Sequence, residues 1–260
     1  YKRQSQPHGA RGFGRRASIA PRTRPPGPGP ALCSRRADAG RHALTDESTD
    51  RETRLAWGIL AAGFVASRIG AAGLFGVTFD DGPLVWFWQY VDPVLLERDA
   101  LRSVYYHHAQ PPLFNLYLAG VLKTCGGQAP ACFAASYHGF GLALHAALFA
   151  LLLRIGAGRW IALATTLAFA FTPASLLYEH WLFYTYPVAT LLVVAAVLVH
   201  RSIAGGGRKR DLLALSATLV AVVLTRSLFH LAWLAGALAL VAWPLRARWR
   251  RTVACASLPV

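Results

Sequence analysis

Long apolar runs recur along the sequence after residue 54, and they restrict the fold more than any other feature. A transmembrane helix needs roughly 20 consecutive apolar residues. Charged residues make up 15% of the chain, whereas soluble domains carry roughly 25%. We therefore predict an all-α fold, a polytopic bundle of transmembrane helices. The predicted spans are residues 55–77, 132–153, 159–178, 184–203, 211–225 and 228–245.

The positions of Lys and Arg predict the orientation of these spans, because cytoplasmic loops of membrane proteins are enriched in both residues. With the N-terminus inside, most basic residues beyond residue 54 fall at inner turns. They are Arg154, Arg159, Arg201, Arg208, Lys209, Arg210, Arg246, Arg248, Arg250 and Arg251. The outer side holds Arg98, Arg102, Lys123 and Arg226, and Arg68 lies within the first span. We predict a multi-pass protein of the plasma or inner membrane with a cytoplasmic N-terminus.

This orientation holds only if residues 112–124 do not cross the membrane. The segment PLFNLYLAGVLK is short, and it follows the double proline Pro111-Pro112, which suits a helix start because proline lacks the N–H that is unpaired there. We expect a helix that lies at the outer interface or dips in and returns. Residues 79–131 would then form a large first extracytoplasmic loop with juxtamembrane helices. If the segment did cross, every later assignment would be inverted.

Residues 1–54 differ in composition from the rest of the chain. They contain twelve of the 27 Lys and Arg and the run RPPGPGP, without an apolar segment. Such a stretch cannot bury enough apolar surface to fold, so we predict a disordered, basic, cytoplasmic tail before a transmembrane domain at 55–260. The tail either contacts anionic lipid headgroups or is an inert extension or a mis-called gene start. It lacks the apolar centre of a signal peptide.

Both ends of the chain predict a fragment. The sequence begins at Tyr1, contains no methionine, and stops in the apolar run ACASLPV. We therefore expect a C-terminal truncation. Cys125 and Cys132 fall on the predicted outer side, where a disulfide can persist. They are either a disulfide or two unpaired small residues.

Most of the unusual polar residues fall on the predicted outer side. They are Asp80, Asp81, Asp92, Glu97, Asp99, His107, His108, Gln110, Glu179, His180, Arg226 and His230. Aromatic residues, among them Tyr184, also fall on the predicted outer side. They are either an interfacial belt of Trp and Tyr, as in many membrane proteins, or part of a functional site. Asp92 is expected to cap a helix over 93–104. The isolated residues His138, His145 and His200 are expected to be packing residues.

Acids beside bases at a membrane surface suit chemistry on a lipid-linked substrate. Asp80 or Asp81 could take a proton from an attacking hydroxyl as the general base. Arg226, with His108 or His230, could hold a leaving phosphate through charge-assisted hydrogen bonds. A carboxylate at the end of an apolar span is costly unless it is paired or faces water. Glu179 is therefore either part of the site or half of a structural Glu179–Arg226 ion pair.

The order of these parts resembles the GT-C membrane glycosyltransferases, such as protein O-mannosyltransferases and lipid A aminoarabinose transferases. In those families a first span leads into an acid pair, as in FDDGP from Phe79 to Pro83. The loop ends in a polar residue before Pro-Pro-Leu, as in HHAQPPLFNL from His107 to Leu116. An acidic or polar outer turn follows the third span, as in LLYEHWLFYTYP. Two departures are Asp81, where Glu is usual, and Ala109-Gln110, where Glu-Lys or Val-His is usual.

The resemblance implies a glycosyltransferase with a polyprenyl-phosphate sugar as donor. It implies Asp80 as catalytic base, with inversion at the anomeric carbon, and Asp81 is the second candidate catalytic residue. The substrate-binding residues would be His107, His108, Gln110, Glu179, Tyr184, Arg226 and His230. Membrane lipids and an acceptor glycan, lipid or protein would be the partners. Neither a nucleotide sugar nor a nucleic acid is expected, and no cofactor is required; the residues allow a divalent cation but do not indicate one.

Two other function classes are compatible with the sequence. A transporter would place polar residues near the middle of broken helices and would show internal repeats. A structural membrane subunit would use the outer loop to bind a partner without catalysis. The predicted spans are nearly free of charge apart from Arg68, and the acids collect on one side, so the glycosyltransferase is the leading hypothesis.

Overall fold

The computed structural model describes the backbone of residues 31–256 and the side chains of residues 50–246; residues 1–30 and 257–260 lie outside the described part. The chain divides into two units, residues 1–49 and 50–260. All regular elements between residues 31 and 256 are helical. They are α1 (Ala31–Phe75), α2 (Pro83–Trp86), α3 (Pro93–Tyr106), α4 (Pro112–Cys125), the 3-10 helix η1 (Gly126–Gln128), α5 (Ala129–Arg154), α6 (Arg159–Ala170), α7 (Pro173–Glu179), α8 (Thr185–Ala204), α9 (Lys209–Thr225) and α10 (Leu231–Ala256).

Three helical stretches in the described region are long and apolar enough to cross a membrane. They are Asp50–Phe75, Pro112–Arg154 and Thr185–Ala204. Helices α6 and α7 form a fourth candidate if they are one span, bent by 60° between Ala170 and Pro173. The described region is thus all-helical, as predicted from the sequence, and it contains three to four candidate membrane-spanning helices.

The number of spans predicted from the sequence, six, exceeds the three or four candidates. The difference lies in the last two. Helix α9 has 17 residues and starts with Lys209, Arg210 and Asp211, and the apolar part of α10, Leu231–Arg246, is also shorter than a typical span. Basic residues and the loop between the helices shorten both apolar runs.

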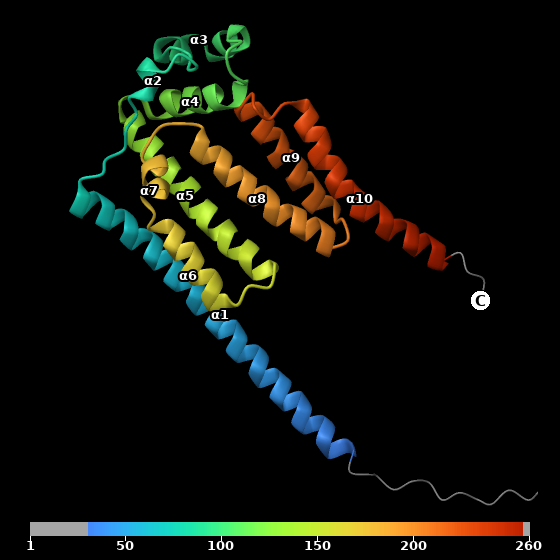
Figure 1. Cartoon of the computed structure of the whole chain (residues 1–260). Helices are drawn as coiled ribbons and strands as arrows, with labels where there is room; N and C mark the ends of the chain where they lie inside the picture. The colour runs from blue at the N-terminus through green and yellow to red at the C-terminus, as the bar shows by residue number, and fades with distance from the viewer. Residues whose placement is uncertain (1–30, 257–260) are drawn as a thin grey trace, which may run out of the picture. The chain divides into compact units, whose positions relative to one another are not determined.

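The segment after the double proline forms a helix of its own. Pro112 occupies the first turn of α4, as its missing N–H predicts. Gly126, with φ of +50°, ends α4, and a Cys125–Cys132 disulfide joins its end to the start of α5. Helix α4 packs against α3, α5 and α9, and Figure 1 shows it crossing the ends of α5 and α8.

The main hydrophobic core lies where α4 meets α5 and the loops above them. Phe133 and Tyr137 of α5, Leu118 of α4 and Leu96 of α3 are fully buried in it. Leu182, in the link between α7 and α8, is buried in the same cluster. Asp92 caps α3, as predicted, by accepting a hydrogen bond from Val94 N–H at 2.8 Å. This core fixes the loops that carry the predicted site residues.

Candidate functional site

Asp80 is joined through its backbone to the link between α7 and α8. It forms an isolated parallel β-bridge with Trp181. The Asp80 N–H donates to the carbonyl of His180 at 2.7 Å, and the Leu182 N–H donates to the carbonyl of Asp80 at 2.9 Å. The bridge brings the acid pair beside the turn that carries Glu179, although about a hundred residues separate them in the sequence.

The side chains of the acid pair differ in setting. The Asp80 carboxylate is exposed and accepts the Gly82 N–H at 2.9 Å, which fixes its direction. A Cβ at position 82 would lie 2.8 Å from Asp80 Oδ1, so glycine allows this tight turn. Asp81 is half-buried, and its carbonyl accepts the Leu84 N–H at the start of α2. Asp80 is therefore the acid that a substrate reaches more readily.

Glu179 is fully buried and is held by three side chains. Arg68 of α1 donates from Nε to Oε1 at 3.0 Å and from Nη2 to Oε2. His138 Nδ1 donates to Oε1 at 2.8 Å, and the Tyr186 hydroxyl donates to Oε2 at 2.7 Å. The alternative Glu179–Arg226 pair is wrong, because Arg68 reaches the carboxylate from the neighbouring helix.

Arg68, like Glu179, forms several hydrogen bonds. Its Nη1 donates to Ser67 Oγ at 2.7 Å and to the carbonyl of Ala170 at 3.1 Å. Its guanidinium carbon lies 3.9 Å from the ring centroid of Phe64. A buried charge without such partners would be strongly destabilising. An Arg within an apolar run is unusual and can be recognised from the sequence. Its partner, Glu179, could not be identified in this way.

One face of α5 accommodates the Glu179 carboxylate. His138, Gly141 and His145 recur at helical spacing on this face. A Cβ at Gly141 would overlap the carboxylate, so only glycine fits there without movement. His145 is buried, donates from Nδ1 to the Gly141 carbonyl at 2.7 Å and packs near Phe64. The packing role predicted for His145 agrees with this setting, whereas His138 forms a hydrogen bond with Glu179, which the packing role predicted for it did not include.

Gln89, in the link between α2 and α3, gathers a second set of polar residues. Its backbone carbonyl accepts from His107 Nε2 at 2.9 Å and from Asn115 Nδ2 at 3.5 Å. Its side-chain oxygen accepts from Gln110 Nε2 and from the Tyr184 hydroxyl at 3.2 Å. Neither Gln89 nor Asn115 belonged to the predicted site, because an isolated amide in an aromatic loop has no distinctive spacing.

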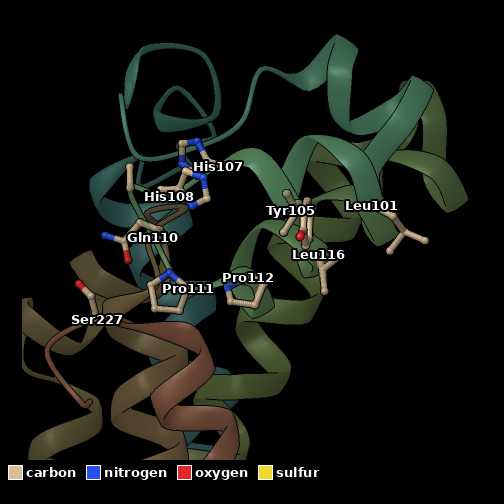
Figure 2. Close-up of a pocket in the computed structure, with 11 residues that line it drawn as sticks. Leu101, Tyr105, His107, His108, Gln110, Pro111, Pro112, Leu116 and Ser227 are labelled. Atoms are coloured by element: carbon tan, nitrogen blue, oxygen red, sulfur yellow. The ribbon is translucent and has the colours of Figure 1, made fainter. Parts of the chain in front are cut away.

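An open cleft of about 570 Å³ lies beside this network. Figure 2 shows His107, His108, Gln110 and Ser227 on one side of it and Leu101, Tyr105 and Leu116 on the other. The cleft is lined by Leu101, Val104, Tyr105, His107, His108, Ala109, Gln110, Pro111, Pro112, Leu116 and Ser227. Gln110 Oε1 is buried without a hydrogen-bond partner. Three predicted substrate-binding residues thus line one cavity.

The last predicted residues lie around the loop between α9 and α10. Arg226 precedes the cleft residue Ser227, and its guanidinium carbon lies 5.1 Å from the ring centroid of Tyr184, a cation–π contact. His230 is exposed, its carbonyl accepts the Leu234 N–H at the start of α10, and it does not line the cleft. Tyr184 therefore links Arg226 to the Gln89 network, and His230 is outside it.

Residues 179–184 connect the acid pair with the cleft. Trp181 bridges Asp80, the Leu182 carbonyl accepts the Tyr90 hydroxyl at 3.3 Å, and the Tyr184 hydroxyl reaches Gln89. Burial raises the pKa of Tyr90 above its ordinary value, so its hydroxyl remains a donor. The predicted residues thus form two neighbouring groups, one around the acid pair and one around the cleft, connected by residues 179–184. Asp80, Asp81 and Glu179 are not part of the cleft lining.

Comparison of the chain with protein family models, with curated proteins and with solved structures finds no match. Among the described residues, no group of three or more His, Cys, Asp or Glu is arranged to hold a metal ion. Function must therefore be inferred from the geometry of the two residue groups and from the motifs that carry them.

Proposed function

We propose that the protein is an integral-membrane glycosyltransferase that moves a sugar from a polyprenyl-phosphate donor to an extracytoplasmic acceptor. The observation that supports this most is the Asp80–Trp181 bridge. It joins FDDGP to the turn after α7, and residues 179–184 continue from there to the network beside HHAQPPL. These are the three segments in which the sequence resembles GT-C enzymes.

In the proposed reaction Asp80 is the general base. Its exposed carboxylate accepts the proton of the acceptor hydroxyl, and the hydroxyl oxygen bonds to the anomeric carbon of the donor. The bond between that carbon and the phosphate oxygen breaks, and polyprenyl phosphate leaves with the electron pair. A positioned base contributes typically 10²–10⁴-fold to such a step. Glu179 cannot share this role easily, because its oxygens already accept from Arg68, His138 and Tyr186.

The cleft is suited to the phosphate end of the donor. Its lining contains His107, His108 and Ser227 but no carboxylate, and Arg226 lies next in sequence to Ser227. Imidazole, hydroxyl and guanidinium groups donate hydrogen bonds to phosphate oxygens. Leu101, Tyr105 and Leu116 on the other side would contact the first isoprene units of the lipid.

Two observations support an extracytoplasmic position for this site. The Cys125–Cys132 disulfide lies at the end of α4 that faces α5, and disulfides persist mainly in oxidising compartments. The turns at the other ends of α5 and α8 carry Arg154 and Arg201, as expected for cytoplasmic turns. The N-terminal tail would then be cytoplasmic.

A polytopic transporter is the second candidate, and the buried cluster favours it. Arg68 and Tyr186 lie in candidate spans, and Glu179 ends a helix pair bent by 60°. Charged residues beside broken helices often form transport sites. However, Glu179 already has four donors from three side chains, which leaves little capacity for a cargo, so a structural anchor explains the cluster more simply.

A donor-consumption assay tests the proposal directly. Membranes containing the protein would receive radiolabelled polyprenyl-phosphate pentoses and hexoses, and loss of label from the lipid fraction would be measured. The double variant Asp80→Asn/Asp81→Asn should lose about 100-fold or more of the rate. The matched control is Glu97→Gln/Asp99→Asn on α3, where both acids are exposed. Retention of the full rate by the Asp80/Asp81 variant would refute the proposal.

A further inference from the structure

A cluster of exposed basic side chains lies at the opposite end of α8 from the candidate site. Arg208, Lys209 and Arg210 are exposed at the turn between α8 and α9, and Arg246 is exposed on α10. Figure 1 shows this turn beside α10. A Cβ at Gly207 would lie 3.4 Å from the Leu245 side chain, which places the turn against the residue preceding Arg246. These four residues form what we call the basic patch.

The elements around the basic patch carry almost no negative charge. Residues 180–260 contain no Asp or Glu other than Asp211. Asp211 is buried and accepts from Arg201 Nη2 at 2.7 Å, so its charge is already paired with a fifth cation. The positive charge of the basic patch can therefore attract an anion from outside the protein.

The start of α9 strengthens the attraction for an anion. Arg208 is the N-cap, and Lys209 and Arg210 are the first helical residues. The N-terminus of a helix carries a partial positive charge, and cations placed there are unfavourable for the helix itself. An anion bound here would relieve this repulsion, because N-terminal N–H groups and basic side chains both favour negative ligands.

Large exposed apolar side chains lie about one helical turn from the basic patch along α9 and α10. Trp243 on α10 is 81% exposed and Leu213 on α9 is 71% exposed. The patch also lies at the end of the candidate span Thr185–Ala204. Exposed Trp next to Lys and Arg at the end of a spanning helix is typical of the headgroup level of a bilayer. A soluble acidic partner would not account for the exposed apolar side chains.

We infer that the basic patch binds the phosphodiester headgroups of anionic phospholipids. Arg208, Lys209, Arg210 and Arg246 contact the phosphates, and Trp243 and Leu213 contact the acyl boundary. Each basic residue near a membrane surface raises the affinity for anionic lipid about fivefold. The inference does not depend on the proposed glycosyltransferase activity.

Energy transfer to labelled lipids tests the inference. The full chain in uncharged detergent would be titrated with dansyl-phosphatidylglycerol and, separately, with dansyl-phosphatidylcholine, with tryptophan as the donor. The wild type should prefer phosphatidylglycerol, and the preference should fall as salt is added. The variant Arg208→Gln/Lys209→Gln/Arg210→Gln should lose about 100-fold of the affinity for phosphatidylglycerol. Circular dichroism would verify that the helices are intact.

A second triple variant separates a local site from a net-charge effect. Arg98→Gln/Arg102→Gln/Lys123→Gln removes three exposed cations from α3 and α4 and should leave the preference unchanged. An equal loss in both variants, or equal binding of the two lipids by the wild type, would overturn the inference. So would binding of the soluble polyanion heparin to the patch without a preference for phosphatidylglycerol.

Discussion

Arg68 and Glu179 are 111 residues apart in the sequence and form a buried, two-pronged ion pair that joins α1 to α7. This ion pair also affects the position of Asp80, the first residue of the acid pair. Glu179 lies two residues before Trp181, which forms the β-bridge with Asp80. Helix α1, which carries Arg68, leads into the segment that carries Asp80. The ion pair therefore fixes both supports of the exposed Asp80 carboxylate.

Removal of one member of this pair should be strongly destabilising. Arg68→Met should lower the free energy of unfolding by about 3–5 kcal/mol, because it leaves a buried carboxylate without its main partner. The double variant Arg68→Met/Glu179→Met should cost less than the sum of the two single variants. Unfolding in detergent, followed by tryptophan fluorescence, measures the coupling.

The exposed pair between Arg159 and Glu52 provides the comparison. Arg159 Nη1 lies 2.7 Å from Oε2 of Glu52, whose side chain is about half exposed, and such pairs contribute about 0–1 kcal/mol. Glu52→Gln should thus change stability little. Strictly additive effects of the Arg68 and Glu179 substitutions would contradict the buried pairing.

Gly141→Ala should disturb the same cluster without changing a charge. The new Cβ would overlap the Glu179 carboxylate, and overpacking of this kind typically costs about 1–3 kcal/mol. Gly139→Ala is the matched control on the same helix, since no atom lies within 4 Å of a Cβ there. It should be neutral or slightly stabilising, because alanine favours helices over glycine. Thermal unfolding of the two variants side by side measures the difference, and equal melting temperatures would argue against the close Gly141–Glu179 contact.

Local features of the fold could be predicted well from the sequence. The cap at Asp92, the helix start at Pro112 and the helical nature of the apolar runs depend on the chain near each residue, and such signals are readable without tertiary structure. Two of the six predicted spans correspond to α9 and the apolar part of α10, which are shorter than typical spans, and their crossing stays a prediction.

The partners of the site residues could not be predicted in the same way. Arg68 meets Glu179 only because α1 packs near α7, and Gln89 meets Gln110 and Tyr184 only because three separate segments fold together. The sequence marked Glu179 as a costly charge at the end of an apolar span and Arg68 as a charge within the first predicted span. It contained no comparable signal for Gln89 or Asn115, because uncharged amides are common in loops.

Gln89 is expected to act through the residues that it holds. Gln89→Ala removes the acceptor shared by Gln110 and Tyr184, so the side of the cleft that carries Gln110 should loosen. If the cleft holds the donor phosphate, KM for the polyprenyl-phosphate sugar should rise about tenfold, the equivalent of one lost hydrogen bond, with a smaller change in kcat. Gln128→Ala, at an exposed position in η1, is the control for loss of an amide. A fall in kcat with unchanged KM would instead place Gln89 in support of the Asp80 group.

Cysteine labelling on intact cells tests the orientation on which the proposed function depends. In a background without the four native cysteines, Ala109→Cys places a thiol in the cleft lining, and Ala204→Cys places one at the exposed end of α8. Ala204 is preferable to Gly206, whose φ of +74° disfavours any other residue. A membrane-impermeant thiol reagent should label Cys at position 109 in intact cells and Cys at position 204 only after permeabilisation. The reverse pattern would put the acid pair in the cytoplasm, where the disulfide would not persist, and would exclude an extracytoplasmic transfer.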